Sequence, residues 1–353
     1  MRKVYDSLIL GSGFAGLSTA LTLGRLHRTC AILSNSTFRN AGAHAAHAIL
    51  GHDGKSPEEI RRTGRLEIEA YRHAEFIDAT IMKVYKENSS RHNHEVFVAE
   101  DQQGNRWAGR SLVIATGSKD VFPDLPGFVE NWPDNIYQCL VCDGHERADL
   151  PKGILAYPQL TILACKMATV AHFESLPPGA GHDATFPPTP SKVTVFTNGP
   201  ANPHNDKEIT RGLHILAGHG ITVDERPIQK LVRDPKEGLH VHFTNSETAY
   251  MGYLFFKPAS TPHSLTQTLI SHFGLDTTST PFGSSLTASV PTMSTNVPGI
   301  FVAGDAGNGM GNGTNAIHTG VAAAAGVTHF VNELDDEIAL KLWMDAQKPR
   351  KEA

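Results

Sequence analysis

Short apolar runs that end in glycine recur along the chain, and they predict an α/β fold. Residues 4 to 9 are mostly apolar and are predicted as a strand, and Leu17 to Leu26 as a helix. Gly11-Ser-Gly-Phe-Ala-Gly16 lies between them, and Cys30 to Leu33 would be the next strand. Strand, glycine turn, helix and strand in this order are typical of a βαβ unit whose glycines let the backbone approach a pyrophosphate.

Two later segments have the pattern of cofactor-contacting turns, in which a short apolar strand stops abruptly in glycine. They are Leu112-Val-Ile-Ala-Thr-Gly117 and Gly299-Ile-Phe-Val-Ala-Gly-Asp305, and the final aspartate suits a hydrogen bond from a cofactor hydroxyl. A helix of small residues is predicted from Thr314 to Ala325, and its N-terminus can point at the same cofactor. We therefore expect a discontinuous nucleotide-binding domain built from residues 1–117 and 251–353.

The region between these segments, residues 118–250, has strand and helix signals of its own and reads as a second α/β domain. Its predicted elements are strands at Gly153 to Tyr157 and Val193 to Thr197, a helix near Glu208 to Gly218, and a further element at Ile221 to Val232. Leu176 to Ser191 is rich in proline and glycine and is predicted as a surface loop.

Composition narrows the possible partners. The 353 residues are 40% hydrophobic and 19% charged, with a formal net charge of -5. Without a long run of lysine or arginine, the chain has no electrostatic footprint for nucleic acid or an anionic membrane surface. Apolar stretches stay short of the roughly 20 residues that a membrane helix needs. We expect a cytoplasmic protein with small-molecule or protein partners, and neither nucleic acid nor membrane among them.

Two of the four cysteines, Cys139 and Cys142, are three residues apart, a spacing that indicates redox chemistry or metal binding. A zinc site would need a second pair, but Cys30 and Cys165 each stand alone and favour packing roles. Among the 19 histidines, His44, His47 and His52 can be drawn as metal ligands, although no carboxylate or cysteine cluster completes a coordination set. We therefore favour a redox pair and no metal.

The ordered set of Gly11 to Gly16, Ala115-Thr-Gly117, Cys139-Leu-Val-Cys-Asp-Gly-His145 and Gly304-Asp305 resembles the low-molecular-weight thioredoxin reductase family over nearly the whole chain. Its most specific element is Cys-x-x-Cys-Asp-Gly between two nucleotide signatures. The resemblance implies FAD as cofactor, a homodimer, and a redox disulfide that usually receives its electrons from NADPH.

The resemblance also implies roles for individual residues. Cys142 would lie against the flavin, Cys139 would exchange with substrate, and Asp143 would transfer protons, with His145 the other nearby candidate base. Ser34 and Asn35 stand where an acidic residue usually meets the adenosine ribose. The residues implied to contact FAD are Gly11, Gly13, Phe14, Ala15, Gly16, Ser34, Asn35, Arg39, Asn40, His47, Ala115, Thr116, Gly117, Gly304, Asp305, Asn315, Ala316 and Ile317.

The chain departs from the family in the domain that should bind NADPH. After the strand at Gly153 to Tyr157, Pro158-Gln-Leu-Thr-Ile-Leu-Ala164 replaces the expected second glycine turn. Where arginines would bind a 2'-phosphate, the next strand runs into Asn198-Gly-Pro200. The expected fold class is thus α/β with two Rossmann-like, three-layer ββα nucleotide-binding domains, the first discontinuous and the second degenerate.

A flavoprotein that keeps its dithiol without a nicotinamide site resembles the dithiol oxidases of the gliotoxin and holomycin type, which close a disulfide in a small natural product. Arg39-Asn-Ala41, with His44, His47 and Asp53-Gly54 after it, also resembles a loop of those enzymes. A small-molecule dithiol would be the electron donor and O2 the acceptor, giving H2O2. Two alternatives stay open: a disulfide reductase that uses NADPH or another donor, and a non-catalytic flavin redox sensor.

Overall fold

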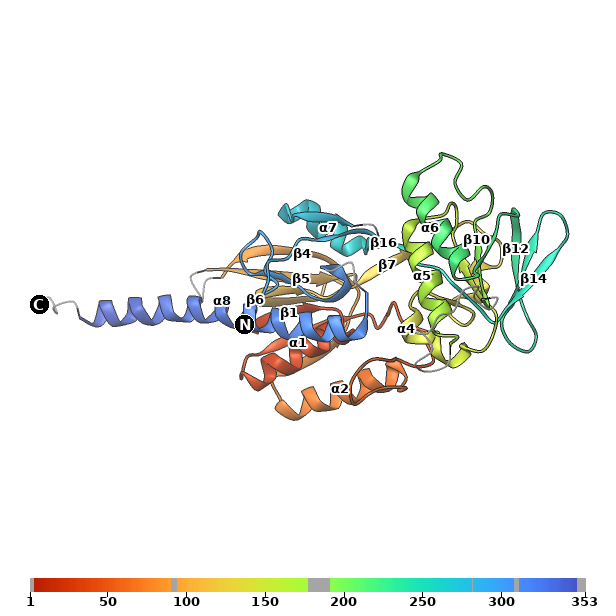
Figure 1. Ribbon diagram of the computed structural model, residues 1–353. Helices are drawn as coiled ribbons and strands as arrows, with labels where there is room; N and C mark the ends of the chain where they lie inside the picture. The colour runs from red at the N-terminus through yellow and green to blue at the C-terminus, as the bar shows by residue number, and fades with distance from the viewer. Residues whose placement is uncertain (1–2, 90–93, 177–190, 281, 308–310, 348–353) are drawn as a thin grey trace, which may run out of the picture. The chain divides into compact units, whose positions relative to one another are not determined.

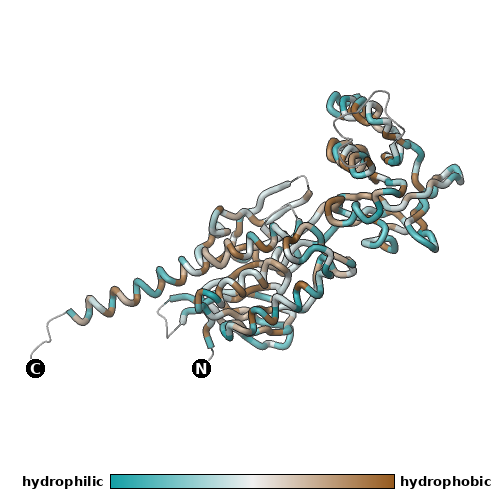
Figure 2. Tube along the Cα trace, turned by 60° about the horizontal axis from the view of Figure 1, so that its bottom comes forward, coloured by the Kyte–Doolittle hydropathy of each residue, from teal (hydrophilic) through white to brown (hydrophobic). Residues whose placement is uncertain are grey.

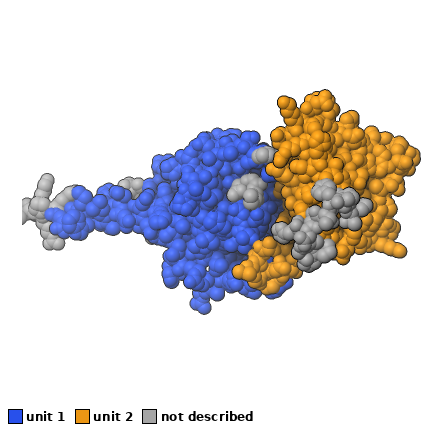
Figure 3. Space-filling model, in the orientation of Figure 1, with its two compact units in different colours: residues 1–41, 56–120, 260–353 blue, residues 42–55, 121–259 orange. Residues whose placement is uncertain are grey.

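A computed structural model describes residues 3–89, 94–176, 191–280, 282–307 and 311–347. The chain divides into two compact units, coloured separately in Figure 3. The first unit comprises Met1–Ala41, Ser56–Asp120 and Ser260–Ala353, and the second comprises Gly42–Lys55 and Val121–Ala259. Figure 1 shows both units and labels many of their elements.

The first unit is built on a seven-stranded sheet of order β3-β2-β1-β6-β5-β4, with β19 also paired to β6. Its strands are β1 (Val4–Leu10), β2 (Cys30–Ser34), β3 (Ala74–Asp78), β4 (Ile81–Asn88), β5 (Glu95–Asp101), β6 (Arg106–Ile114) and β19 (Ile300–Val302). Strand β1 lies between two parallel partners, with Ile9 opposite Ile32 on one side and Val113 on the other. The carboxyl ends of the parallel strands therefore meet at one edge, where nucleotides bind in such sheets.

Helices α1 (Phe14–Arg25), α2 (Pro57–Tyr71) and α8 (Gly313–Ala346) belong to the same unit, as does α7 (Ser264–Phe273). Small residues let α1 and α8 pack closely: a Cβ on Gly320 would lie 2.3 Å from the carbonyl oxygen of Ala15. The hydroxyl of Thr19 donates to the carbonyl of Gly320 across this contact at 3.0 Å. The cluster formed by α1, α8 and the sheet includes Leu23, Ala324 and other fully buried residues.

A four-stranded sheet of order β17-β18-β16-β7 lies where the chain passes between the units. Its members are β7 (Ser118–Val121), β16 (Ala259–Pro262), β17 (Thr277–Thr280) and β18 (Gly283–Leu286). Two of the four points at which the chain passes from one unit to the other thus fall after Asp120 and after Ala259, whereas the sequence placed the boundaries after residues 117 and 250.

The second unit has a parallel five-stranded sheet of order β11-β10-β9-β15-β8 and an antiparallel three-stranded sheet of order β12-β13-β14. The strands are β8 (Ile136–Tyr137), β9 (Lys152–Leu155), β10 (Val193–Phe196), β11 (Thr222–Asp224), β12 (Ile228–Arg233), β13 (Leu239–Phe243), β14 (Thr248–Met251) and β15 (Tyr253–Phe255). The helices are α3 (Phe128–Asn131), α4 (Leu140–Asp143), η1 (His145–Arg147), α5 (Ile162–Phe173) and α6 (Lys207–Gly218). Two α/β units with parallel sheets confirm the predicted fold class.

Two segments differ from the sequence prediction, and a third is not tested. The element expected at 221–232 is two strands in different sheets, because Pro227 and the ion pair between Asp224 and Arg226 turn the chain between them. Strand β15 lies beyond the expected boundary at residue 250, yet it pairs with β9 and β8 of the second unit. The loop predicted from Leu176 to Ser191 falls almost wholly outside the described residues.

Helix α8 continues to Ala346, far past the predicted end at Ala325, because helix-forming residues follow the small ones. Figure 2 shows hydrophilic and hydrophobic residues intermixed along this continuation. Leu342 and Trp343 are 65% and 63% exposed there. None of the helices in the described part of the chain combines the length and apolar character needed to cross a membrane.

A buried ion pair lies in the core of the second unit. The side chain of Lys152, on β9, is fully buried, and its Nζ lies 3.6 Å from Oε2 of Glu174 and donates to the carbonyl of Ala171 at 2.9 Å. The hydroxyl of Tyr253 donates to the same Glu174 oxygen at 3.3 Å. Burial lowers the pKa of Lys152, and the charge of Glu174 opposes that change.

Removing one partner of this pair should destabilise the protein, because an ammonium group would remain buried without its counter-charge. We predict that Glu174→Gln lowers the free energy of unfolding by about 2 kcal/mol, measured by urea denaturation. Glu69→Gln, which breaks a solvent-exposed pair with Arg65, serves as the control and should cost less than about 0.5 kcal/mol. Equal losses in the two variants would contradict this assignment.

Candidate functional site

The glycine turn after β1 has the close packing that a dinucleotide site requires. Gly11 has a φ of +106°, and a Cβ there would lie 2.5 Å from the carbonyl oxygen of Ala115. A Cβ on Gly16 would lie only 2.0 Å from the carbonyl oxygen of Gly11. By contrast, a Cβ on Gly13 would meet no described atom within 4 Å. Gly11 and Gly16 hold the turn and helix together, and Gly13 leaves open space beside the backbone.

That open space lies at the N-terminus of α1. Gly13 is the N-cap residue, and within the described parts of the chain no side chain caps this helix by a hydrogen bond. Helix N-terminal N–H groups without partners favour an anion, and phosphate is a common one. Phe14, which begins the helix, is half-buried, whereas Ala15 is buried. These residues fit the pyrophosphate of FAD as the resemblance implies.

The end of β2 lies beside the same turn. The hydroxyl of Ser12 donates to Oγ of Ser34 at 2.9 Å, and the N–H of Ser36 donates to that oxygen at 3.1 Å. Oδ1 of Asn35 accepts from the N–H of Thr37 at 3.2 Å. Polar but uncharged groups therefore occupy the position at which an adenosine ribose is expected.

Asp305, in η3 (Gly304–Ala306), is held by an arginine from the loop after β2. Nη1 of Arg39 lies 2.9 Å from Oδ2 of Asp305, and Nε lies 3.1 Å from the carboxylate of Asp120. Gly304 has a φ of +68°, and its N–H donates to the hydroxyl of Thr319 at 2.9 Å. A carboxylate accepts about four hydrogen bonds, so the bond to Arg39 leaves Asp305 capacity for a ribityl hydroxyl.

A buried hydrogen-bond donor at the start of α8 also fits a bound cofactor. Oδ1 of Asn312 caps this helix by accepting from the N–H of Asn315 at 2.7 Å. The side-chain amide nitrogen of Asn315 is buried, and among the described residues it has no hydrogen-bond partner. A buried donor without an acceptor is costly, and a bound cofactor oxygen or ring nitrogen would satisfy it. Ala316 and Ile317, which follow, are half-buried.

The remaining residues implied to contact FAD also lie in the first unit, with one exception. Ala115, Thr116 and Gly117 follow β6, where the hydroxyl of Thr116 contacts that of Thr266 at 2.7 Å and Gly117 has a φ of +72°. Oδ1 of Asn40 accepts from Arg61 at 2.9 Å. The exception is His47, described below. The first unit therefore brings together residues that fit FAD.

The redox pair lies in the second unit. Cys139 and Cys142 form a disulfide with a Cα–Cα distance of 5.3 Å, and both are half-buried at α4. Val141 between them is 69% exposed, so the motif has an accessible face. Burial raises the pKa of Asp143, next in sequence, to about 6, against the lowering effect of His47. A carboxyl group with that pKa can both accept and release protons near neutrality.

The glycine that ends the motif is required by packing. A Cβ on Gly144 would lie 2.8 Å from the carbonyl oxygen of Leu140 and 2.9 Å from Oε2 of Glu174. The Cys-x-x-Cys-Asp-Gly turn thus rests directly on the buried ion pair of Glu174 and Lys152. His145, which follows the motif, is exposed.

The second unit also contains the loop of residues 42–55, which sequence reasoning assigned to the other domain. Nδ1 of His47 lies 3.5 Å from Oδ1 of Asp53, and its Nε2 lies 3.5 Å from Oε1 of Glu146. The structure thus places His47 in the same unit as the cysteine motif. The resemblance implied that His47 contacts FAD. Glu146 was missed altogether, because only folding reveals its contact with this loop.

The second βα turn contrasts with the first. Between β9 and α5 the hydroxyl of Thr161 caps the helix by accepting from the N–H of Ala164 at 3.2 Å. No glycine lies between Leu155 and Thr161 to let a pyrophosphate approach. The N-terminus of α1 is therefore open to an anion, whereas the N-terminus of α5 is already capped by the side chain of Thr161.

Acidic groups from the end of β11 lie beside the turn that follows β10. Oε1 of Glu225 accepts from the N–H of Ala201 at 2.7 Å, and Asn198 accepts from the N–H of Ile228 at 2.7 Å. Arg226 is bound to the carboxylates of Asp224 and Glu247. A 2'-phosphate would meet a carboxylate here, which disfavours NADPH.

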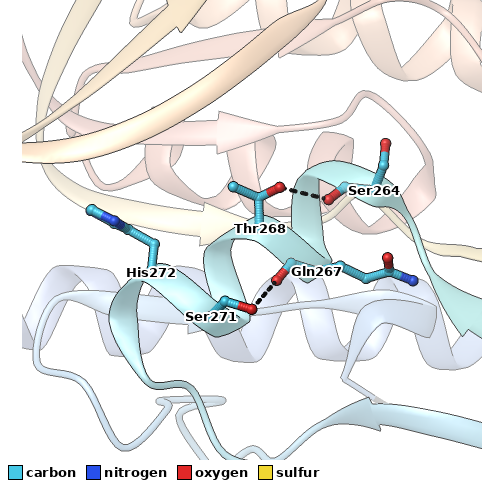
Figure 4. A pocket seen from close by; sticks show the side chains of 5 residues that line it. All are labelled: Ser264, Gln267, Thr268, Ser271 and His272. Carbon is cyan, nitrogen blue, oxygen red and sulfur yellow. Dashed lines mark hydrogen bonds between the residues drawn. The ribbon is translucent and has the colours of Figure 1, made fainter.

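A shallow hollow of about 600 Å³ lies along α7, lined by Ser264, Gln267, Thr268, Ser271 and His272. Figure 4 shows that all five side chains come from one helix. The hydroxyls of Thr268 and Ser271 donate to the carbonyls of Ser264 and Gln267 at 3.1 and 3.2 Å. The hollow is open to solvent and contains none of the residues discussed above. In the described residues, no group of three or more histidine, cysteine, aspartate or glutamate side chains is arranged to hold a metal.

Comparisons with known proteins agree with this arrangement. Residues 5–162 match the model of the pyridine nucleotide-disulphide oxidoreductase family. Thioredoxin reductase sirT of Leptosphaeria maculans is 31% identical over 330 residues, 92% of this chain and 94% of its own. Thioredoxin reductase aclD of Aspergillus oryzae is also 31% identical, over 92% of this chain and 95% of its own. Among solved structures, an oxidoreductase from Agrobacterium tumefaciens has a TM-score of 0.76 and 25% identity, covering 93% of this chain and 98% of that one.

The glycine turn yields a direct prediction. Gly16→Ala should abolish FAD binding, because the new methyl group cannot fit 2.0 Å from the carbonyl of Gly11 without moving the turn. Flavin absorbance of the purified protein measures this. Gly64→Ala is the matched control: it is also helical, its Cβ would meet only Leu17 at 3.7 Å, and it should retain full flavin. Normal flavin content in the Gly16 variant would contradict our assignment of the turn.

Proposed function

This chain belongs to the thioredoxin reductase family of FAD-dependent pyridine nucleotide-disulphide oxidoreductases, and within that family we propose that it is a dithiol oxidase. It would close a disulfide in a small-molecule substrate, with O2 as the final electron acceptor and H2O2 as the second product. The proposal rests on one contrast. The helix N-terminus of the first unit is open, whereas that of the second is capped by Thr161.

The contrast bears on the direction of electron flow. A reductase needs a hydride donor bound at the second unit, and the capped helix and the carboxylate of Glu225 both oppose NADPH there. The cysteine pair is nevertheless complete. A pair that receives no electrons from a nicotinamide can still receive them from a thiol substrate.

The cysteine pair would perform the exchange in two steps. A substrate thiolate attacks Sγ of Cys139, which forms a mixed disulfide and releases the thiolate of Cys142. The second substrate thiolate then attacks the substrate sulfur of that mixed disulfide, which closes the substrate disulfide and releases the thiolate of Cys139. Two electrons pass to the protein, and the two thiol protons pass to a base and then to solvent. FAD, when bound, would provide the two-electron acceptor for the reduced Cys139–Cys142 pair, and O2 would be the final acceptor.

Asp143 is the chain's own candidate for the proton acceptor. It directly follows Cys142, and burial raises its pKa to about 6. Above that pH the group is ionised and can accept a thiol proton; below it the group is already protonated and cannot. The rate of exchange should therefore rise as the pH passes through about 6.

The alternative is a disulfide reductase, which the names of the relatives and of the family favour. Such an enzyme would use NADPH or another donor at a site unlike the usual one. A flavin-bearing redox sensor without turnover is a third possibility, which sustained peroxide production with a dithiol would exclude. The homodimer implied by the resemblance is compatible with all three.

Anaerobic mixing of the holoenzyme with each candidate donor separates oxidase from reductase. We predict that dithiothreitol, as a model dithiol, bleaches the flavin absorbance within seconds to minutes, and that NADPH at the same concentration does not. Admitting O2 should restore the absorbance and release H2O2. Rapid bleaching by NADPH without bleaching by the dithiol would reject the oxidase and favour the reductase.

The role of Asp143 gives a second test. Asp143→Asn should lower the rate of flavin reduction by a dithiol about 100-fold at pH 7.5, because an amide cannot accept the thiol proton. Asp149→Asn, an exposed aspartate of the same unit, is the control and should retain the wild-type rate. A rate within twofold of wild type in the Asp143 variant would remove this residue from the mechanism.

A further inference from the structure

A largely buried arginine, Arg39, joins two carboxylates of the first unit. Its side chain is 14% exposed, and the side chains of Asp120 and Asp305 are 7% and 20% exposed. Nε of Arg39 donates to both oxygens of Asp120 at 3.1 Å, and Nη2 donates to Asp120 as well. Nη1 donates to Oδ2 of Asp305 at 2.9 Å. Two nitrogens of the planar guanidinium thus bind Asp120, and the third binds Asp305.

The backbone that carries Arg39 is held on both sides by Arg61 of α2. The central carbon of the Arg61 guanidinium lies 3.9 Å from the centroid of the Phe38 ring, and Nη1 donates to Oδ1 of Asn40 at 2.9 Å. The N–H of Ala41 donates to the carbonyl of Phe38 at 3.1 Å, which closes the turn. Arg39 is therefore fixed through its neighbours as well as through its own side chain.

Gly311 packs against the bond between Arg39 and Asp305 itself. A Cβ on Gly311 would lie 2.5 Å from Nη1 of Arg39 and 3.2 Å from Oδ2 of Asp305, so a larger residue there would displace the guanidinium. Gly304, which precedes Asp305, has a φ of +68°, and a Cβ there would lie 2.9 Å from Cβ of Ala15. Both the side chain and the backbone of Asp305 are thus confined.

From these contacts we propose that Arg39 is a positioning residue for FAD, which acts through Asp305, whereas the resemblance implies that it contacts the cofactor directly. By holding Oδ2, the guanidinium fixes the orientation of the Asp305 carboxylate and leaves Oδ1 for a ribityl hydroxyl. Asp120 anchors the arginine in turn. The inference goes beyond the proposed function, because it concerns FAD binding and not the source or the destination of the electrons.

The balance of charges favours this indirect role. The guanidinium of Arg39 already has a carboxylate at each of two sides, so its positive charge is compensated within the protein. Without it, Asp120 and Asp305 would lie close together in a largely buried place with no cation between them. The carboxylate of Asp305 would then turn away from Asp120, and ordering it again when FAD binds would reduce the affinity.

The two halves of FAD separate this role from a general loss of folding. ADP has the adenosine and diphosphate groups that fit Ser34, Asn35 and the N-terminus of α1, but it lacks the ribityl chain. If Arg39 acts by orienting Asp305, its loss should weaken FAD and leave ADP unchanged. A distorted domain would weaken both ligands.

The experiment measures binding to the full chain after its flavin has been removed, with the fold checked by circular dichroism. Quenching of flavin fluorescence gives the dissociation constant for FAD, and isothermal titration calorimetry gives that for ADP. The variants are Arg39→Met, Asp305→Asn and the two combined. Arg62→Met, which changes an exposed arginine of α2, is the matched control.

Arg39→Lys is included in case the Met variant fails to fold. It retains a positive charge between the two carboxylates, but an ammonium group lacks the planar fork that binds both of them at once. It should weaken FAD binding at least about threefold and leave ADP binding unchanged.

We expect Arg39→Met to weaken FAD binding about 10- to 100-fold, the range that a hydrogen bond to a charged group supplies, and to change ADP binding by less than about twofold. Arg62→Met should equal wild type for both ligands. In the Asp305→Asn background, Arg39→Met should cause little further loss, because the arginine acts through that carboxylate.

Three results would overturn the inference. They are unchanged FAD binding in the Arg39 variants, equal losses for FAD and ADP, and a loss from Arg39→Met that is as large in the Asp305→Asn background as in wild type. The last result would show that Arg39 contacts FAD directly. If a dithiol fails to reduce the bound flavin, the proposed function fails, but these ratios of dissociation constants stand.

Discussion

The first four N–H groups of a helix have no partner within that helix, and something must satisfy them. This chain meets the requirement differently in its two units. At α1 the N-cap is Gly13, which offers no side chain and leaves room beside it, so a phosphate can bind. At α5 the hydroxyl of Thr161 already occupies that role. Both units have an α/β fold with a helix N-terminus of this kind. The first unit keeps its helix open for a nucleotide, whereas the cap on α5 of the second unit disfavours NADPH, the usual donor.

The redox motif depends on a second constraint, the packing of its turn on a buried charge pair. At position 144 only glycine fits between the carbonyl of Leu140 and the side chain of Glu174. The carboxylate of Glu174 in turn compensates the charge of the fully buried Lys152. The turn is therefore fixed by the core of its own unit. Next to this turn, Nε2 of His47 lies 3.5 Å from Oε1 of Glu146, and burial raises the pKa of Asp143 to about 6.

The sequence predicted most of the fold, because its signals are local. The strand of residues 4 to 9 and the glycine turn after it lie where periodicity and glycine spacing place them. The position of His47 was not predictable in this way, because its contact with Glu146 joins residues far apart in the chain. Likewise the buried partnership of Lys152 with Glu174 leaves no sequence pattern. Periodicity identifies which residues are buried, but not which charged residues are buried together.

Equilibrium binding of NADPH to the oxidised holoenzyme is the most direct test, because it shows whether the second unit can hold this donor at all. Isothermal titration calorimetry is suitable, with free FAD titrated into the apoprotein as the positive reference for the open site. We predict saturable FAD binding to the apoprotein and no saturable binding of NADPH to the holoenzyme up to millimolar concentration. Saturable NADPH binding at micromolar concentration would contradict it, because the capped helix of the second unit would then have to open for a phosphate.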